Sequence, residues 1–196
     1  MCGIFGIEGH EDAANITYLG LYAQQHRGQE SGGIVSWDGS RLSVQRGMGQ
    51  VADIFRMKVL ERLPGDRAVG HIRYSTSGAS ILGNAQPIVV KTAMGPLATV
   101  HNGTLVNAVE IRNRLEREGS IFQTTSDTEV ILHLMARQPR GNVVESLMAA
   151  LAQVEAVNAG ALRHELAESN VALAEESLAA EEALKEAGRS IQRNLL

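Results

Sequence analysis

The only cysteine of this chain is Cys2, which directly follows the initiator Met1. If Met1 is removed, the Cys2 thiol and a free α-amine belong to the same residue. A thiol with a free pKa near ~8.5 is mostly protonated at neutral pH, and an α-amine that titrates near ~8 can take its proton, directly or through a water molecule. Cys2 therefore suits a nucleophile with its own general base. The alternative is an incidental small residue after Met1, because free cysteines are often simply buried hydrophobes.

Asn102-Gly103 is a second motif that could take part in such chemistry. It follows a predicted strand, and Asn-Gly readily forms the tight turn of a hairpin because it tolerates positive φ. In the functional alternative, the Asn102 side-chain amide and the Gly103 N–H point at a developing oxyanion. The motif by itself supports either interpretation.

Two charged residues could bind a substrate through its ionic groups. Arg73 is either an exposed strand residue or the guanidinium fork that binds a carboxylate. Asp127 lies in the first turn of a predicted helix, where its carboxylate favours the helix dipole or binds an ammonium group. Arg27-Gly28 closes the first predicted helix, where Gly28 is either an ordinary C-terminal stop or part of the same site.

These motifs occur with Cys2 in one order and with particular neighbours, and in that combination they resemble a known family. The pattern is similar to the N-terminal glutaminase domain of the amidophosphoribosyltransferases, which are class-II glutamine amidotransferases. Other class-II amidotransferases share the Cys, Arg, Asn-Gly and Asp residues, but the neighbours of Arg27 and Arg73 favour the phosphoribosyl family. The resemblance runs from Cys2 to about Leu151 and rests on these segments: Cys2-Gly3-Ile4-Phe5-Gly6-Ile7, Gln25-His26-Arg27-Gly28-Gln29-Glu30-Ser31, Gly70-His71-Ile72-Arg73-Tyr74-Ser75-Thr76, Gln86-Pro87, His101-Asn102-Gly103 and Thr124-Thr125-Ser126-Asp127.

The resemblance implies an α+β fold of the Ntn-hydrolase type, in which two antiparallel sheets form an αββα sandwich with helices outside. It places the processed terminal Cys2 at the end of a strand and makes it the nucleophile. It also implies that Asn102 and Gly103 form the oxyanion hole. The implied reaction converts glutamine to glutamate and ammonia through a thioester on Cys2.

The resemblance further assigns residues to substrate binding. By motif matching, Arg73 would bind the α-carboxylate of glutamine and Asp127 its α-amine. Thr76 and the Arg27-Gly28 turn would line the pocket and support the nucleophile.

Short apolar runs between turn signals predict the strands that must position these residues. They cover residues 4–7, 34–37, 42–45, 68–74, 88–92 and 97–101. Helical spacing predicts helices at 13–25 and at 107–118, the second ending at Gly119. A third helix is predicted to begin at Ser126 and to end before Pro139, because Ser126 and Glu129 have the spacing of a capping box.

The chain changes character near residue 140, since every aromatic residue lies at or before Phe122 and Ala, Leu and Glu dominate the remainder. This composition predicts a long helix or a helical hairpin and is poor material for strands. We therefore expect a glutaminase-like domain at 1–154 and a helical extension at 155–196. Neither further strands nor a phosphoribosyltransferase domain is indicated, so the sandwich is expected to be incomplete. Uncovered sheet edges favour a homo-oligomer or a partner chain bound through residues 155–196.

Composition also excludes several classes of function. A net charge of −4 with scattered Lys and Arg gives no basic surface for nucleic acid. The sequence has neither an apolar run of about 18 residues nor the charged start of a signal peptide, so a cytoplasmic location without membrane contact is expected. One cysteine and six histidines without paired ligand spacing predict no metal, and no other cofactor is expected in this chain.

Two classes of function follow from these features. The first is the glutaminase half-reaction of a purine-pathway glutamine amidotransferase, with glutamine as its substrate. The alternative is a non-catalytic assembly or binding module that keeps the motifs and docks a partner through its helical tail. Retained Met1 would count against catalysis, because it blocks the α-amine of Cys2.

Overall fold

The computed structural model describes residues 2–74, 79–93, 95–138 and 142–160. The chain divides into two units, residues 1–154 and residues 155–196. Residues 155–160 are the described part of the second unit, and they are helical. The rest of the predicted helical extension, residues 161–196, lies outside the described residues.

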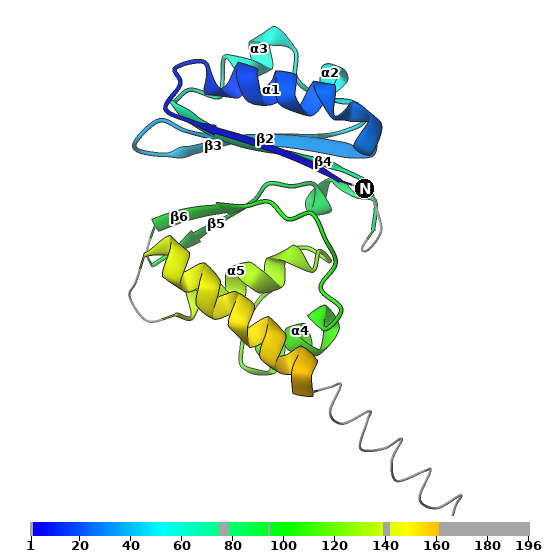
Figure 1. Cartoon of the computed structure of the whole chain (residues 1–196), viewed down its shortest axis with the longest axis vertical. Helices are drawn as coiled ribbons and strands as arrows, with labels where there is room; N and C mark the ends of the chain where they lie inside the picture. Colours follow the sequence, from blue (N-terminus) through cyan, green and yellow to red (C-terminus); the bar gives the residue numbers. More distant parts are fainter. Residues whose placement is uncertain (1, 75–78, 94, 139–141, 161–196) are drawn as a thin grey trace, which may run out of the picture. The chain divides into compact units, whose positions relative to one another are not determined.

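The first unit contains two antiparallel sheets between two groups of helices (Figure 1). The larger sheet has four strands in the order β1-β4-β2-β3, and all neighbouring strands are antiparallel. Its strands are β1 (Gly3–Glu8), β2 (Ser31–Trp37), β3 (Leu42–Met48) and β4 (Arg67–Arg73). The four predicted strands of this sheet are confirmed, although β2 begins three residues early because its ladder includes Gly32 and Gly33, which lack apolar side chains.

Helix α1 (Ala13–Ala23) packs on this sheet and closes the main core. Leu21, Ile34 and Ile72 are fully buried in that core. Gly70 of β4 permits the close approach of the helix, because a Cβ at this position would lie 2.6 Å from Leu21 Cδ1. The helix thus fixes one face of β4 and leaves the other face for the site.

Two short helices extend the layer of α1, α2 (Val51–Ile54) and α3 (Met57–Leu60). Val51 is fully buried and Leu60 is 8% exposed, so both helices contribute to the main core. The sequence did not predict them, because four residues are too few to show helical periodicity.

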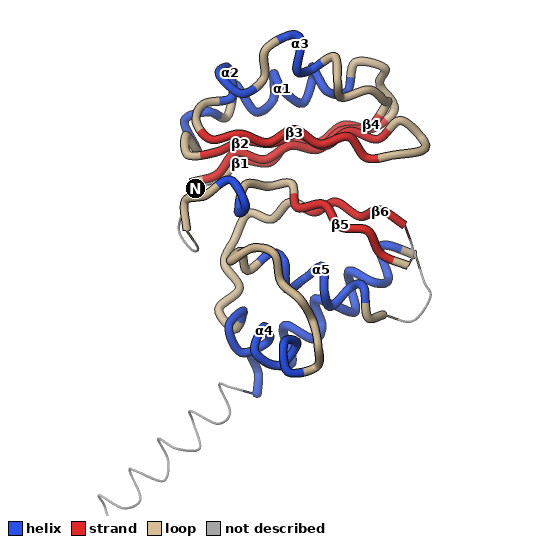
Figure 2. The backbone as a smooth tube through the Cα atoms, turned by 180° about the vertical axis from the view of Figure 1, so that it is seen from behind, coloured by secondary structure: helices blue, strands red, loops and turns tan. Residues whose placement is uncertain are grey.

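The second sheet faces the opposite side of the first sheet (Figure 2). It consists of β5 (Ile88–Thr92) and β6 (Gly95–Thr99), which pair antiparallel. Helix α5 (Thr128–Ala136) contacts β5, and α4 (Ala108–Arg117) contacts α5. The observed layers therefore match the predicted αββα sandwich, and within the described residues the second sheet has two strands.

The boundaries of α4 follow the predicted signals. The helix begins after Asn107 and ends before Gly119, whose φ of +90° is a conformation that glycine adopts without strain. Residues 143–160 form a further helix, in which Ser146, Ala150 and Val154 are buried at four-residue spacing. One face of this helix, up to residue 154, therefore packs within the first unit.

The predicted capping box of the third helix is wrong. Helix α5 begins at Thr128, and Ser126 Oγ accepts a hydrogen bond only from the Thr128 N–H, at 3.3 Å. The buried Glu129 carboxylate instead accepts hydrogen bonds from the N–H groups of Gln123, at 2.8 Å, and Thr124, at 2.7 Å. The loop before the helix folds back across it, so Glu129 satisfies loop donors rather than the helix start.

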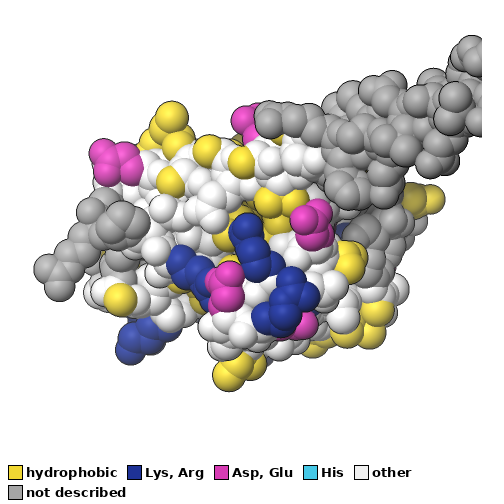
Figure 3. Space-filling view, turned by 90° about the horizontal axis from the view of Figure 1, so that it is seen from below, with side chains coloured by type: hydrophobic (Ala, Val, Ile, Leu, Met, Phe, Trp, Pro, Cys, Tyr) yellow, Lys and Arg dark blue, Asp and Glu magenta, His cyan; other side chains and the backbone are white. Residues whose placement is uncertain are grey.

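The outer surface mixes both signs of charge. Lys and Arg side chains lie among Asp and Glu side chains on the face shown in Figure 3. Two ion pairs lie on α4 and at the ends of α4 and α5. Arg112 pairs with Glu116 at 3.3 Å, and Arg137 pairs with Glu118. No described helix is long and apolar enough to cross a membrane.

Candidate active site

Cys2 lies directly before β1, at the end of that strand which pairs with the end of β4. This is the end marked N in Figure 2. The side chain is half-buried, and Sγ donates a hydrogen bond to the Tyr74 carbonyl oxygen at 3.6 Å. The candidate nucleophile is thus fixed by a paired strand, which positions a side chain more closely than a loop does.

Two side chains distant in sequence bind the carbonyl oxygen of Cys2. Arg27 Nε and Asn102 Nδ2 each donate a hydrogen bond to this oxygen, and both distances are 3.0 Å. Asn102 makes this bond with one of its two amide N–H donors, so its side chain lies beside the nucleophile. The structure therefore brings together Cys2, Arg27 and Asn102, which are separated by up to 100 positions in the chain.

Gly28 is not an ordinary helix stop. Helix α1 ends at Ala23, and a 3-10 turn (Gln25–Arg27) precedes Gly28, whose φ of −168° is extended backbone that any residue adopts. A Cβ at Gly28 would lie 2.7 Å from the Arg73 carbonyl oxygen. Glycine is needed here because two backbones touch, and this contact links the Arg27 turn to Arg73.

Arg73 is not an exposed strand residue, since only 6% of it is exposed. Its Nη1 group forms an ion pair with Glu30 Oε1 at 2.9 Å and also donates to the Ala79 carbonyl oxygen at 3.0 Å. These bonds orient the planar guanidinium, which has five N–H donors. A fixed guanidinium of this kind suits the recognition of a carboxylate.

Asp127 precedes α5 but does not cap it with a side-chain hydrogen bond. Its Oδ2 atom accepts a hydrogen bond from the Leu105 N–H at 2.9 Å, and Oδ1 accepts one from Thr128 Oγ1 at 3.4 Å. The carboxylate therefore ties the segment that follows Asn102 to the start of α5. Its position is compatible with the predicted binding of an ammonium group.

Asn102-Gly103 does not form a hairpin turn. Strand β6 ends at Thr99, two residues before the predicted end, and the chain continues toward α4. A Cβ at Gly103 would lie 2.8 Å from His101 Nε2, so the turn is tight. The hairpin alternative is thus excluded, while Thr76, the remaining predicted pocket residue, lies outside the described residues.

His71 is a buried titratable group close to the site, and the sequence did not single it out. It is fully buried in β4, and burial lowers the pKa of its imidazole to about 4. The His101 backbone lies close enough to offset part of this shift, although neither ring nitrogen makes a hydrogen bond of normal geometry to a described residue. The imidazole is therefore neutral at neutral pH.

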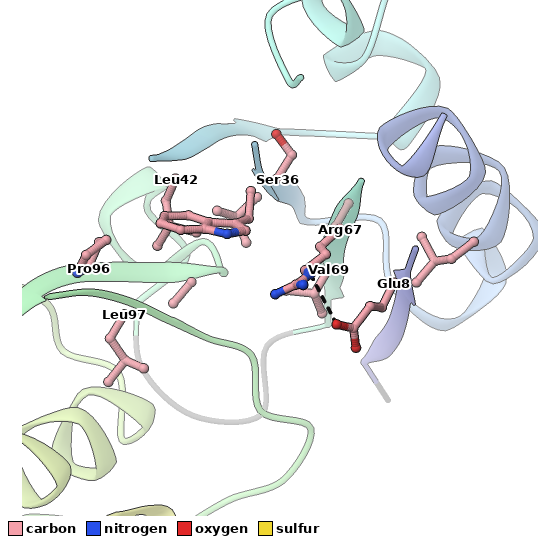
Figure 4. A pocket seen from close by; sticks show the side chains of 12 residues that line it. Glu8, Ser36, Leu42, Arg67, Val69, Pro96 and Leu97 are labelled. Carbon is pink, nitrogen blue, oxygen red and sulfur yellow. Dashed lines mark ion pairs between the residues drawn. The ribbon is translucent and has the colours of Figure 1, made fainter. Parts of the chain in front are cut away.

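A cavity among the described residues is separate from this site. It has a volume of about 420 Å³ and lies between the two sheets (Figure 4). Glu8 and Arg67, which form an ion pair at 3.1 Å, lie at the ends of β1 and β4 that are remote from Cys2. None of the predicted site residues lines it.

Two buried polar residues behind the site were also missed, Asn84 and Gln86. Gln86 stands in one of the segments that carry the family resemblance, so a signal for it existed. Asn84 stands in a short 3-10 turn (Leu82–Asn84) with no pattern that marks it. Their roles depend on partners from distant segments, which no local pattern reveals.

Comparisons with known proteins show what this chain is similar to. Residues 71–154 match the family model described as glutamine amidotransferase domain. The chain is 49% identical to amidophosphoribosyltransferase of Bacillus subtilis over 137 aligned residues, which are 69% of this chain and 29% of the relative. It is 46% identical to amidophosphoribosyltransferase of Rhizobium etli over 155 aligned residues, which are 79% of this chain and 31% of the relative.

Solved structures show the same fold. The glutamine phosphoribosylpyrophosphate amidotransferase of B. subtilis, solved with ADP and GMP, superposes with a TM-score of 0.71 at 42% identity and covers 78% of this chain and 33% of that one. A structure described as the allosteric regulatory enzyme of purine biosynthesis gives a TM-score of 0.73 at 43% identity, with the same coverage. The predicted α+β sandwich of the Ntn-hydrolase type is thereby confirmed.

The chain spans about a third of the length of these relatives. No comparison favours the alternative of a non-catalytic assembly module. The chain is therefore similar to the amidophosphoribosyltransferases over about a third of their length, and residues 71–154 match the model of the glutamine amidotransferase domain.

Proposed function

We propose that this chain hydrolyses glutamine to glutamate and ammonia, with Cys2 as the nucleophile. The observation that carries the proposal is the pair of hydrogen bonds from Arg27 and Asn102 to the Cys2 carbonyl oxygen. The Asn102 amide lies beside Cys2 at the end of a strand, which supports the roles of oxyanion donor for Asn102 and nucleophile for Cys2. The similarity to amidophosphoribosyltransferases supports purine biosynthesis as the pathway.

The reaction would proceed through a thioester. Once Met1 is removed, the Cys2 α-amine takes the thiol proton, and the thiolate attacks the side-chain amide carbon of glutamine. Asn102 and the Gly103 N–H stabilise the oxyanion of the tetrahedral intermediate. The C–N bond then breaks, and ammonia leaves with the proton from the α-ammonium group.

Water completes the reaction. The α-amine accepts a proton from a water molecule, which attacks the thioester carbon. The C–S bond breaks, glutamate leaves, and the thiol is restored. No redox partner is needed, since every bond change is a substitution at an acyl carbon.

Arg73 and Asp127 would recognise the amino-acid end of the substrate. The guanidinium would bind the α-carboxylate, and the Asp127 carboxylate would bind the α-ammonium group. Thr76, Arg27 and Gly28 would line the pocket and support the nucleophile. Glu30 contributes by orienting Arg73, with which it pairs at 2.9 Å.

Glutamate formation from glutamine tests this proposal. The protein without Met1, as verified by intact mass, is expected to produce glutamate, and Cys2→Ala is expected to abolish production. Cys2→Ala should fold normally, because the Cys2 hydrogen bonds to Arg27 and Asn102 use the backbone carbonyl. A well-folded protein that lacks Met1 and yields no glutamate would overturn the assignment.

A further inference from the structure

Two buried amide side chains lie behind the candidate site, on the segment that joins β4 to β5. Asn84 is fully buried, and Gln86 is 6% exposed. Neither belongs to the residues assigned above to catalysis or substrate binding. Their hydrogen bonds nevertheless reach the segments that carry Asn102 and Asp127.

Asn84 joins the Arg73 side of the site to the Asp127 side. Its Nδ2 group donates to the Ala79 carbonyl oxygen at 2.8 Å, and Arg73 Nη1 donates to the same oxygen at 3.0 Å. Asn84 Nδ2 also donates to Thr125 Oγ1 at 2.7 Å, and Asn84 Oδ1 accepts from the Thr125 N–H at 3.0 Å. Thr125 stands two residues before Asp127, so one amide spans both substrate-binding segments.

Gln86 fixes the segment that leads into Asn102. Its Oε1 atom accepts from the His101 N–H at 2.6 Å, and Nε2 donates to the His101 carbonyl oxygen at 3.3 Å. The same Nε2 group donates to Thr128 Oγ1 at 3.2 Å, next to Asp127. This pairing explains why β6 ends before His101, since the backbone of His101 is bonded to a side chain instead of a strand.

The segment that carries both amides is itself attached to the four-stranded sheet. Arg46 Nη1 donates to the Ala85 carbonyl oxygen at 2.9 Å. Gly33 of β2 lies so close that a Cβ there would be 2.1 Å from the Gln86 carbonyl oxygen. The amides therefore act from a backbone that cannot move without disturbing a packed sheet.

We propose that Asn84 and Gln86 form a positioning clamp that sets the spacing between Arg73, Asn102 and Asp127. The inference rests on the proposed glutaminase function. An amide suits this task because it offers two donors and an acceptor, so a single side chain can fix two segments in one orientation. Burial strengthens these bonds, and a displacement of about 1 Å in an active site can cost about 10²-fold in rate.

The clamp makes a different kinetic prediction for each amide. Asn84→Asp places a carboxylate oxygen against the Ala79 carbonyl oxygen and disturbs Arg73 and Asp127, which bind the ground state. The KM for glutamine should rise by roughly tenfold or more, with kcat within about twofold. Gln86→Glu places a carboxylate oxygen against the His101 carbonyl oxygen, so kcat should fall by about 10²-fold through Asn102, with a smaller change in KM.

Two further variants keep the test informative if a buried substitution impairs folding. Thr125 is exposed, so Thr125→Val should fold. The variant lacks the hydroxyl that accepts a hydrogen bond from Asn84 Nδ2, and this loss should raise the KM by a few fold. The matched control is Asn113→Asp, the same chemical change at an exposed position of α4, which should leave KM and kcat unchanged. Thermal unfolding of each variant gives the folded fraction.

The clamp is overturned if Asn84→Asp and Thr125→Val keep the wild-type KM, or if Asn84→Asp lowers kcat alone in proportion to its lost folded fraction. Failure of the proposed function is distinct, because wild-type protein would then form no glutamate. In that case the clamp is judged by the Kd for glutamine, measured by calorimetry on the same variants. A wild-type protein that does not bind glutamine overturns both proposals.

Discussion

At the scale of single residues, the site depends on backbone carbonyls as much as on side chains. The Cys2 carbonyl oxygen accepts hydrogen bonds from Arg27 and Asn102. The Ala79 carbonyl oxygen accepts hydrogen bonds from Arg73 and Asn84. A side chain that binds a backbone oxygen fixes a whole segment, since the backbone cannot rotate away as a side chain does. Substitutions at these donors should therefore act mainly by displacing the backbone segments of the site and less by changing its charge.

His71 gives a residue-scale prediction on pH. Its folded pKa of about 4 lies below the ordinary value of 6.5, so the unfolded state binds more protons between these two values. Stability should consequently fall as pH drops from about 6.5 toward about 4. Relative to His71→Leu, the wild-type free energy of unfolding should decrease by about 2 kcal/mol between pH 7 and pH 5, as measured by urea unfolding.

The difference between the two proteins matters here, because carboxylates titrate over part of the same range in both. Equal pH dependence of wild type and His71→Leu would contradict the buried neutral imidazole. An imidazole proton signal of His71 that titrates near pH 6.5 in the folded protein would contradict it directly.

At the scale of elements, the site is where the end of the α1 layer meets the ends of β1 and β4. The 3-10 turn after α1 brings Arg27 to Cys2, and Gly28 lies against Arg73. Apolar periodicity predicted that these strands and this helix exist. It did not predict their contacts, because the register between β1 and β4 and the close approach at Gly28 arise only when distant segments pack.

Gly28→Ala should test the backbone contact. The added Cβ would meet the Arg73 carbonyl oxygen at 2.7 Å, and a strand backbone cannot yield as a flexible side chain does. We expect a loss of about 1–3 kcal/mol in the free energy of unfolding, together with a lower kcat/KM for glutamine. Gly6→Ala in β1 is the matched control, because its Cβ would have its nearest contact at 3.5 Å. Equal stability of the two variants would contradict the contact.

Glu129 provides a second prediction at this scale. Its carboxylate accepts the N–H groups of Gln123 and Thr124, so Glu129→Gln places an amide N–H₂ group beside backbone donors. The variant should lose about 1–3 kcal/mol in the free energy of unfolding. A capping box would instead make Ser126→Ala the costlier change, by about 1 kcal/mol. Denaturant unfolding of both variants decides between these expectations.

At the scale of the whole molecule, the chain spans about a third of the relatives that it matches. Within the first unit, Asn107 Nδ2 donates to the Val154 carbonyl oxygen at 2.8 Å, and Ser146, Ala150 and Val154 are buried. The helix up to residue 154 is therefore part of this unit, and a chain that ends before it should be less stable.

Truncation tests this division of the chain. A protein that ends at residue 154 should keep the melting temperature of the first unit, whereas one that ends at residue 142 should melt at a lower temperature, because the buried face of the helix is lost. Calorimetry of the two proteins measures the difference. The sequence predicts either a homo-oligomer or a partner chain bound through residues 155–196. Light scattering after size exclusion tests the first of these, which requires a defined oligomer of the full chain that is lost on deletion of 155–196.

The sequence by itself predicted the chemistry. Cys2, Asn102, Arg73 and Asp127 could be proposed as nucleophile, oxyanion donor and ionic groups because their residue types, order and neighbours resemble a known family. The same resemblance implied the sandwich, and apolar runs and helical spacing predicted the strands and helices within it. Only the tertiary structure showed that the backbone of Gly28 lies against the backbone of Arg73. Packing also excluded the hairpin at Asn102-Gly103, because the partners that settle it lie far away in the chain.

The same reason explains Asn84, Gln86 and Glu129. Each is a polar side chain whose hydrogen-bond partners come from other segments, so its role depends on which segments meet. Local sequence fixes the type of a side chain and the propensity of its backbone. Long-range packing fixes its hydrogen-bond partners. The partners of the Asn84 and Gln86 amides are the basis for proposing the clamp behind Cys2.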